Sequence, residues 1–362
     1  MSLAWKPNWE ETKQHFTDWW HHRGFVIATW GAPLPEGQAQ EETVRPDQSY
    51  SLRNAHCDGS LRARLNHYKM SRQYFPVDAM PVADTTIGPG SLALYLGSEA
   101  KFEPTTIWYE PNLHECSDPE GLPPFTFDES NSWWKITESV IKECLRLSPG
   151  KYMVGCPDLV ENLDILASLR TPEVLMMDLL DRPEWVEKKV AEINQVWFKA
   201  YQRIYDLIKL DDGSAAFVAL QLWGPGKTAK LQCDCSAMFS PEMFDRFVLP
   251  ALKEQCAWLD FSMYHLDGPK AICHLDTLLK IEDLDAVQWS SGAGNEGGGS
   301  ARWFPMYKRI LDAGKSVQII GAKLEEIPPL VKAIGTKGVY IRIFPPEDKD
   351  VAGIISLAEK YW

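Results

Sequence analysis

The sequence predicts an α/β fold, specifically a closed (β/α)₈ TIM barrel with long βα loops and an N-terminal helical extension. Short β-rich runs alternate along the chain with longer helical patterns, which is typical of βα units and a parallel sheet. Several runs are apolar on both faces, as expected for strands that helices cover on both sides. The runs are as many as the strands of such a barrel, and they span residues 24–30, 79–84, 151–156, 217–222, 262–267, 285–289, 316–320 and 338–343.

The segments between these runs begin with residues that start helices. Thr171 and Ser240 each supply a capping hydroxyl, and each is followed by a proline and then a glutamate. Proline is favoured at the first helical position, and the helix dipole stabilises an acidic side chain there. Asp181 and Pro183 open a long helical segment in the same way. Because no repeat or linker divides the chain, we expect a single barrel domain over residues 1–362.

Composition and charge restrict the classes of partner. The chain has 37 Lys and Arg against 50 Asp and Glu, which gives a formal net charge of −13. Nucleic acids and anionic membranes attract clustered cations, so we expect neither as a partner. No apolar run reaches the roughly 18 residues of a membrane-spanning helix. The first residues lack the layout of a signal peptide, and eight cysteines are too few for a disulfide scaffold. We therefore expect a cytoplasmic enzyme acting on a small-molecule substrate, and a homodimer is compatible with the sequence.

The strongest candidate site lies at the end of the predicted strand 262–267. His265 and Asp267 stand two residues apart there, and side chains at this spacing share one face of a strand. In barrels the carboxyl ends of the strands carry the chemistry. The pair predicts a catalytic site, either as metal ligands or as an oriented acid–base pair. The alternative is a structural histidine that only forms a hydrogen bond at the strand end.

A second cluster follows the fourth predicted strand, where Cys233 and Cys235 flank an aspartate. Zinc binds thiolate, imidazole and carboxylate groups. The two cysteines are therefore expected to join His265 and Asp267 in one metal site. A Cys-x-Cys pair also occurs as two inert, half-buried thiols, and that alternative stays open.

Two acids close earlier strands. Asp84 ends the run 79–84 and is the third predicted catalytic residue, because an acid among apolar neighbours is expected to have a raised pKa and to handle protons. Asp158 follows the run 151–156 in a similar way. Either acid could instead cap the next helix. Arg342, on the last predicted strand, is expected to contact an anionic group or to form a structural ion pair.

The chain contains 15 tryptophans, an unusual number. Tryptophan can wall a cavity for a flat or apolar ligand, although ordinary packing accounts for most of them. The glycine-rich loop 290–300 contains Glu296, which together with Asp84 would suit a sugar hydrolase using two carboxylates. The residues predicted to bind substrate are Trp30, Asp158, Trp223, Tyr264, Trp289, Glu296 and Arg342.

Several short motifs, taken together, resemble the uroporphyrinogen decarboxylase superfamily, which also contains cobalamin-dependent methyltransferases. The similarity is clearest from about residue 79 to the end. The motifs are Val82-Ala-Asp84, Gly155-Cys-Pro157, Ala219-Leu-Gln-Leu222, Ser240-Pro-Glu-Met-Phe244 with Leu249-Pro250, and His265-Leu-Asp-Gly268. The resemblance implies a (β/α)₈ barrel, in agreement with the count of strands above.

The chain departs from the true decarboxylases of this superfamily. They carry an arginine-rich segment after the first strand, where this chain has Trp30-Gly-Ala-Pro33. A tetrapyrrole with many carboxylates needs cationic partners to offset its desolvation. Leu163 stands about where the decarboxylases have a tyrosine, whereas Asp84 matches their catalytic aspartate. Tetrapyrrole decarboxylation by a lyase is therefore the alternative function.

The methyltransferase branch looks closer. Its enzymes bind zinc through a His-x-Cys pair and a later cysteine, and here Asp267 replaces the first cysteine while the last strand has none. The resemblance thus implies zinc with Cys233 or Cys235 as a substitute ligand. It also implies a cobalamin cofactor, carried by a corrinoid protein that docks at the barrel mouth. The predicted function is a corrinoid-linked methyltransferase moving a methyl group between a small substrate and cobalamin. A non-catalytic binding protein is the remaining alternative.

Overall fold

The computed structural model describes residues 2–343 and 348–362. Its helices are α1 (Trp9–Trp20), α2 (Leu52–Cys57), α3 (Gly59–Ser71), α4 (Leu92–Tyr95), α5 (Ser132–Leu147), α6 (Asn162–Arg170), α7 (Pro172–Asp181), α8 (Pro183–Ile208), α9 (Pro241–Phe247), α10 (Leu249–Trp258), α11 (Leu275–Leu279), α12 (Phe304–Asp312), α13 (Ile327–Ile334) and α14 (Asp348–Tyr361). Its strands are β1 (Phe25–Ala28), β2 (Ala32–Pro33), β3 (Gln73–Tyr74), β4 (Val82–Ala83), β5 (Glu99–Phe102), β6 (Ile107–Glu110), β7 (Met153–Cys156), β8 (Ala215–Phe217), β9 (Leu222–Gly224), β10 (Thr228–Gln232), β11 (Phe261–Asp267), β12 (Ala286–Ser290), β13 (Ser316–Ile320) and β14 (Val339–Arg342).

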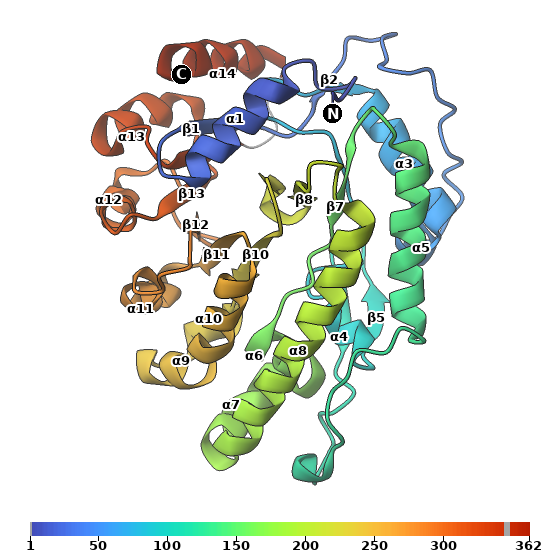
Figure 1. The fold of residues 1–362 in the computed structure, drawn as a ribbon, viewed down its shortest axis with the longest axis vertical. Coiled ribbons are helices and arrows are strands. Elements are labelled where there is room, and N and C mark those ends of the chain that lie inside the picture. The colour runs from blue at the N-terminus through green and yellow to red at the C-terminus, as the bar shows by residue number, and fades with distance from the viewer. Residues whose placement is uncertain (1, 344–347) are drawn as a thin grey trace.

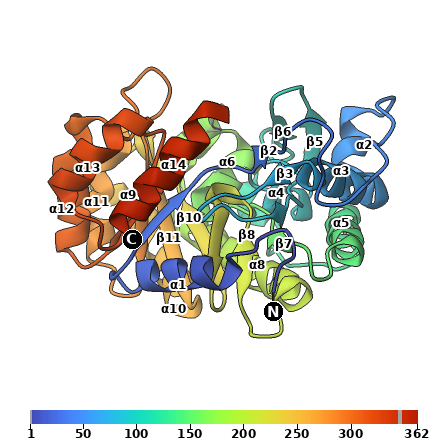
Figure 2. The same cartoon turned by 90° about the horizontal axis from the view of Figure 1, so that it is seen from above.

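The strands form a parallel core under a layer of helices. The larger sheet has six parallel strands in the order β1-β14-β13-β12-β11-β10, and a smaller sheet has the order β4-β7-β8-β9. Figure 1 shows the helices from α3 to α14 around these strands. In the view turned by 90°, β10 and β11 lie between α12 and α13 on one side and α3 and α5 on the other (Figure 2). The predicted α/β class with parallel strands is therefore confirmed.

The strand predictions hold for every run except the fourth. The run 217–222 is not one strand, because β8 ends at Phe217 and a short 3₁₀ turn, Ala219–Gln221, reverses the chain into the antiparallel strand β9. Leu220 and Gln221 have φ values of 61° and 52° in this turn. The run is apolar because this part of the chain is largely buried, and burial alone does not distinguish a strand from a turn. The strand that joins the larger sheet is β10, which the sequence analysis missed.

The expected closed barrel is seen as two separate sheets, one parallel and one that ends in the antiparallel strand β9. Within residues 2–343 and 348–362, the hydrogen-bonded ladders join β1 to β14 and β4 to β7, and none joins β1 to β4 or β9 to β10. A single closed barrel of eight strands thus stays a prediction. The N-terminal helical extension is confirmed as α1, and the side chains of Thr171 and Ser240 cap α7 and α9 as expected.

Helix α1 packs on β1 and β9 through aromatic side chains. The ring of Phe16 is fully buried and lies 6.3 Å from Trp19, 6.4 Å from Trp223 and 5.3 Å from Tyr340, centroid to centroid. All three contacts are edge-to-face, an arrangement that adds to the free energy of burying the rings. Because these rings come from α1, β9 and β14, the helix ties together strands of both sheets. In the described part of the chain, no helix has the length and apolar character needed to cross a membrane.

Replacing Phe16 with alanine tests this packing. The Phe16→Ala variant leaves a cavity among the three rings, and we expect it to lose about 3–5 kcal/mol of unfolding free energy. Urea denaturation followed by tryptophan fluorescence measures the loss. The matched control is Gln14→Ala on the exposed face of α1, which should change stability by less than about 0.5 kcal/mol. Equal stability of the two variants would contradict this role of α1.

Candidate active site

Two cavities lie on either side of the turn that follows β8. The smaller has a volume of about 210 Å³ and is lined by Pro89, Asp158, Ala219, Leu220, Lys230, Gln232, Asp234 and His265. The larger has a volume of about 480 Å³ and is lined by Trp30, Gly31, Asn66, Lys69, Met70, Gln73, Phe75, Met80, Val82, Asp84, Val218 and Gln221. Residues 218–221 contribute to both cavities, so this turn is the partition between them. Gln232 and His265 stand at or near the carboxyl ends of parallel strands, where barrel chemistry is found.

His265 is held in one orientation by the neighbouring strand. His265 on β11 pairs in register with Gln288 on β12, and the Oε1 atom of Gln288 accepts a hydrogen bond from Nδ1 of the imidazole. Burial, and then the ammonium group of Lys230, lower the pKa of His265. The imidazole is therefore neutral near pH 7, and its Nε2 atom is left free to accept a proton or to bind a cation.

Two carboxylates lie beside this nitrogen. Ligand atoms of Asp234, His265 and Asp267 all lie within 4.8 Å of one another, and Nε2 of His265 is 3.9 Å from Oδ1 of Asp234. Desolvation and the nearby Asp164 carboxylate raise the pKa of Asp234 to about 7. The structure thus brings the predicted pair His265 and Asp267 together with a third acid. One imidazole and two carboxylates form a donor set suited to a divalent cation.

A buried lysine, which the sequence analysis missed, forms the floor of the smaller cavity. Lys230 on β10 is 3% exposed, and its Nζ atom lies 2.9 Å and 3.0 Å from the two carboxylate oxygens of Asp158. It also donates to Oε1 of Gln232. Burial acts to lower the pKa of Lys230, but Asp158 and Glu161 outweigh it and the pKa is raised. Its charge is therefore kept. The signal in the sequence was a lysine flanked by the apolar residues Ala229 and Leu231.

The segment that brings the acids to Lys230 has a strained backbone. Val160 and Asn162 have φ values of 54° and 55°, a left-handed region that is costly for a β-branched residue. Between them, Glu161 is fully buried and accepts a hydrogen bond from the backbone N–H of Gln232. Burial raises the pKa of Glu161 well above its ordinary value. Strain of this kind is retained where the surroundings hold it, often at functional sites.

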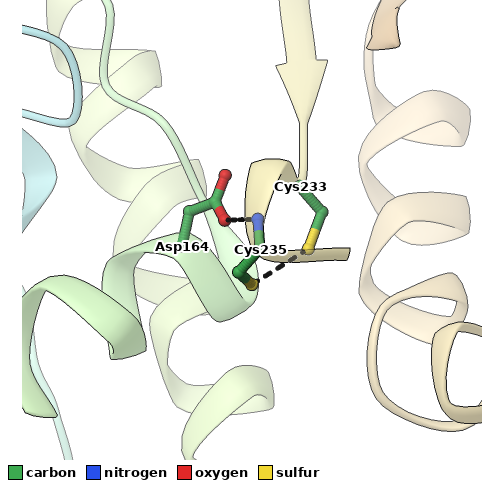
Figure 3. Close-up of side chains that lie close together, drawn as sticks. All are labelled: Asp164, Cys233 and Cys235. Atoms are coloured by element: carbon green, nitrogen blue, oxygen red, sulfur yellow. Dashed lines mark hydrogen bonds between the residues drawn. The ribbon is translucent and has the colours of Figure 1, made fainter. Parts of the chain in front are cut away.

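The two cysteines form a separate group (Figure 3). The sulfur atoms of Cys233 and Cys235 are 3.6 Å apart, and they cluster with Asp164 rather than with His265. Asp164 accepts hydrogen bonds from the backbone N–H groups of Cys235, at 2.9 Å, and Asp234, at 2.7 Å. Its carboxylate therefore shapes the Cys-Asp-Cys loop. The four residues of the expected single metal site thus fall into two groups, and a site that combines them stays a prediction.

The thiols of this loop are protonated in the protein as it stands. Burial raises the pKa of Cys233 to about 11, and the hydrogen bond with Cys233 together with burial raises that of Cys235 further. A thiol becomes a good ligand only when it loses its proton. In the Asp234–His265–Asp267 group the imidazole is already neutral near pH 7, whereas Asp234, whose pKa is raised to about 7, must lose its proton before it binds a cation.

Asp84 does not share the smaller cavity. It lines the larger one, where the guanidinium of Arg62 lies 2.7 Å from its Oδ2 atom. Desolvation acts to raise the pKa of Asp84, but the charge of Arg62 outweighs it and the pKa is lowered. The expectation of a raised pKa is thus wrong, because an arginine distant in the sequence holds the carboxylate ionised, while the catalytic role of Asp84 stays a prediction.

The predicted substrate-binding residues divide between cavities and core. Asp158 lines the smaller cavity, and Trp30 lines the larger one with the guanidinium of Arg342 lying 3.9 Å from its ring centroid. Glu296 borders a different cavity of about 460 Å³ beside α12 and α13. Because Asp84 and Glu296 line separate cavities, the sugar hydrolase that would use both acids on one bond is not supported.

Three of the predicted substrate-binding aromatics lie in the packed core. Trp223 packs edge-to-face on Trp9 at 5.5 Å, Tyr264 on Phe244 at 6.3 Å, and Trp289 lies tilted against Trp303 at 4.8 Å. Tyr264 alternates with His265 along β11 and so points to the opposite face, toward the helices. The contacts found for Trp223, Tyr264 and Trp289 are thus packing contacts, and a role of these residues in substrate binding stays a prediction.

Comparison with known proteins supports the fold. No protein-family model matches the chain, and no curated protein matches its sequence. The structure is similar to that of a methyltransferase from Methanosarcina mazei, with a TM-score of 0.61 at 10% sequence identity over 96% of this chain and 98% of that one. At this identity the likeness shows a shared fold. Membership of the uroporphyrinogen decarboxylase superfamily stays a prediction.

Removing the buried lysine tests the charge balance of the site. Lys230→Met leaves Asp158 and Glu161 without their counter-charge, and we expect a loss of about 3–5 kcal/mol of unfolding free energy near neutral pH. The pKa of Glu161, already raised in the folded wild type, rises further when the charge of Lys230 is removed. The deficit should shrink as pH falls from about 8 to about 5. Thermal unfolding at both pH values measures this.

The matched control is Lys142→Met, since Lys142 forms an exposed ion pair with Glu138. It should unfold like the wild type at both pH values. A Lys230→Met variant whose deficit stays constant with pH would contradict the proposed balance.

Proposed function

We propose that the chain is a methyltransferase that moves a methyl group between a small substrate and a corrinoid cofactor, with a divalent metal held by Asp234, His265 and Asp267. The observation that carries the proposal is the neutral, oriented imidazole of His265 between two carboxylates at the edge of a cavity. The fold shared with a methyltransferase supports the same reaction class. The donor set and the shared fold both support this proposal of methyl transfer.

The donor set fits zinc. Zinc binds imidazole nitrogen and carboxylate oxygen, and a catalytic site keeps one position open for the substrate. Gln288 accepts a hydrogen bond from the far side of the His265 ring, and such a bond orients the ring of a histidine that binds a metal. The negative charge around Asp234 favours a cation. When bound, such a metal lowers the pKa of a substrate thiol or hydroxyl, or polarises the oxygen of a methyl ether.

The chain's own residues then orient and confine the substrate. Lys230 keeps its charge between Asp158 and Gln232, and so fixes the floor of the smaller cavity. Pro89 and Leu220 supply apolar walls to the same cavity. His265, neutral and fixed by Gln288, does not need to lose a proton before it binds a ligand.

The size of the smaller cavity supports a corrinoid that is bound outside it. Cavities of about 300–1,000 Å³ hold ligands of drug size, whereas the smaller cavity measures about 210 Å³. It accommodates a methyl group and the atoms next to it, and no macrocycle. We therefore propose that the corrinoid is presented by a partner protein at the strand ends.

Metal analysis is the first test. Purified protein should bind about one zinc per chain. His265→Ala and Asp267→Asn should abolish tight binding, and Gln288→Leu should weaken it by about 10- to 100-fold. The double variant of Cys233 and Cys235 to serine is the matched control and should keep its zinc. Zinc retained in His265→Ala but lost from the double cysteine variant would assign the metal to the Asp164 group instead.

Methyl transfer is the second test. Demethylation of methylcobalamin, followed by its absorbance spectrum with a panel of small thiols and alcohols as acceptors, should require bound zinc and be lost in His265→Ala. A wild-type protein loaded with zinc but inactive with every acceptor, and inactive in the reverse direction with methyl ethers, would contradict the proposal.

One observation keeps tetrapyrrole decarboxylation as a second candidate. Asp84, which matches the catalytic aspartate of the decarboxylases, is ionised and lines the larger cavity. Turnover of uroporphyrinogen by the wild type and its loss in Asp84→Asn would favour that reaction. Absence of porphyrinogen binding would eliminate it.

A further inference from the structure

Arg342 is a buried cation without an acidic partner. It stands at the carboxyl end of β14, in register with Ala28 of β1 and Ile320 of β13, and is 7% exposed. Across the described residues it forms no ion pair and no side-chain hydrogen bond. Its one specific contact is with Trp30, whose ring lies under the guanidinium at 3.9 Å.

Another buried arginine of the chain, Arg170, has an acidic partner. Arg170 is 3% exposed, and its guanidinium donates to both carboxylate oxygens of Asp178, at 2.8 Å and 3.1 Å. Burying a charge without such a partner is costly. Burial accordingly lowers the pKa of Arg342. In the free protein no acidic side chain offsets the desolvation of the Arg342 guanidinium. Arg342 is therefore suited to bind an anionic ligand.

The surroundings of Arg342 favour an anion. Trp30, under the guanidinium, also lines the cavity of about 480 Å³. Among charged residues lining that cavity, Lys69 is exposed and has no ion pair within the described chain, while Asp84 is neutralised by Arg62. Lys69 is therefore a cationic group on this lining without a counter-charge in the described chain, and the guanidinium of Arg342 adjoins the lining through its contact with Trp30.

The walls of the same cavity favour an organic body attached to that anion. Its lining includes the apolar side chains of Met70, Phe75, Met80 and Val82. The buried Oε1 atom of Gln221, another lining residue, has no hydrogen-bond partner in the part of the chain described. It would accept a hydrogen bond from a ligand hydroxyl or amide.

We propose that the larger cavity binds a small organic acid, whose carboxylate pairs with Arg342 and whose apolar or aromatic body lies against Trp30 and the apolar wall. A guanidinium pairs with a carboxylate through two parallel hydrogen bonds, a geometry that an ammonium lacks. A volume of about 480 Å³ suits a ligand of this size. That the acid is the substrate of methyl transfer rests on the proposed function, whereas its binding does not.

Calorimetric titration of the full chain with three probes tests this site. Benzoate should bind, and benzamide, which has the same ring without the charge, should bind at least about tenfold more weakly. Phenyl phosphate distinguishes a carboxylate site from a general phosphate site and should bind more weakly than benzoate. Phenyl phosphate binding more tightly than benzoate would overturn the assignment to a carboxylate.

The decisive variant is Arg342→Met. It should weaken benzoate binding by about tenfold or more, and it should unfold at a higher temperature than the wild type, because it removes an unpaired buried charge. A structural arginine would give the opposite change in unfolding temperature. Arg309→Met is the matched control, since Arg309 forms an exposed pair with Asp276, and it should change neither quantity.

Lys69→Gln, at an exposed position, provides a second test of benzoate binding. This test does not depend on whether Arg342→Met folds. It should weaken benzoate binding by about two- to fivefold. The proposal is overturned if benzoate does not bind the wild type, or if Arg342→Met and Lys69→Gln both bind it as the wild type does. Benzoate binding retained in a protein without methyl-transfer activity would contradict the proposed function and leave this site intact.

Discussion

The ion pair between Lys230 and Asp158 is the interaction on which the candidate site depends. Lys230 belongs to the larger sheet and Asp158 follows β7 of the smaller sheet, so the pair crosses the gap between two ladders that no backbone hydrogen bond joins within the described chain. Glu161 crosses the same gap to the backbone of Gln232. The contacts of Asp158 and Glu161 with β10 thus connect the two sheets where no strand pairing does. They also bring these acidic groups close to His265.

The scaffold was predictable because it depends on local patterns. Apolar runs marked most strands, and alternation placed His265 and Asp267 on one face of β11 while Tyr264 took the other. The position of a single tryptophan was harder to predict. An apolar residue in the sequence is compatible both with a ring that lines a cavity and with a ring that packs under a helix. Trp30 and Trp223 show the two outcomes.

The candidate site was less predictable because its partners come from distant parts of the chain. Asp158 stands 72 residues before Lys230, and Arg62 stands 22 residues before Asp84. The local sequence does not show which acidic side chain will form an ion pair with which basic one. That ion pair decides whether the carboxyl group is ionised. The pKa of Asp84 is lowered and that of Asp234 is raised for this reason. The grouping of Cys233 with Asp164 has the same origin.

The turn at Ala219–Gln221 has a consequence for how the two cavities communicate. Leu220 faces one cavity and Gln221 the other, and their carbonyl groups accept hydrogen bonds from Gln318 and Tyr340. The wall is therefore a single thickness of backbone, anchored from the opposite sheet. Because adjacent residues of one turn line both cavities, a ligand that displaced this turn from one cavity would also alter the lining of the other.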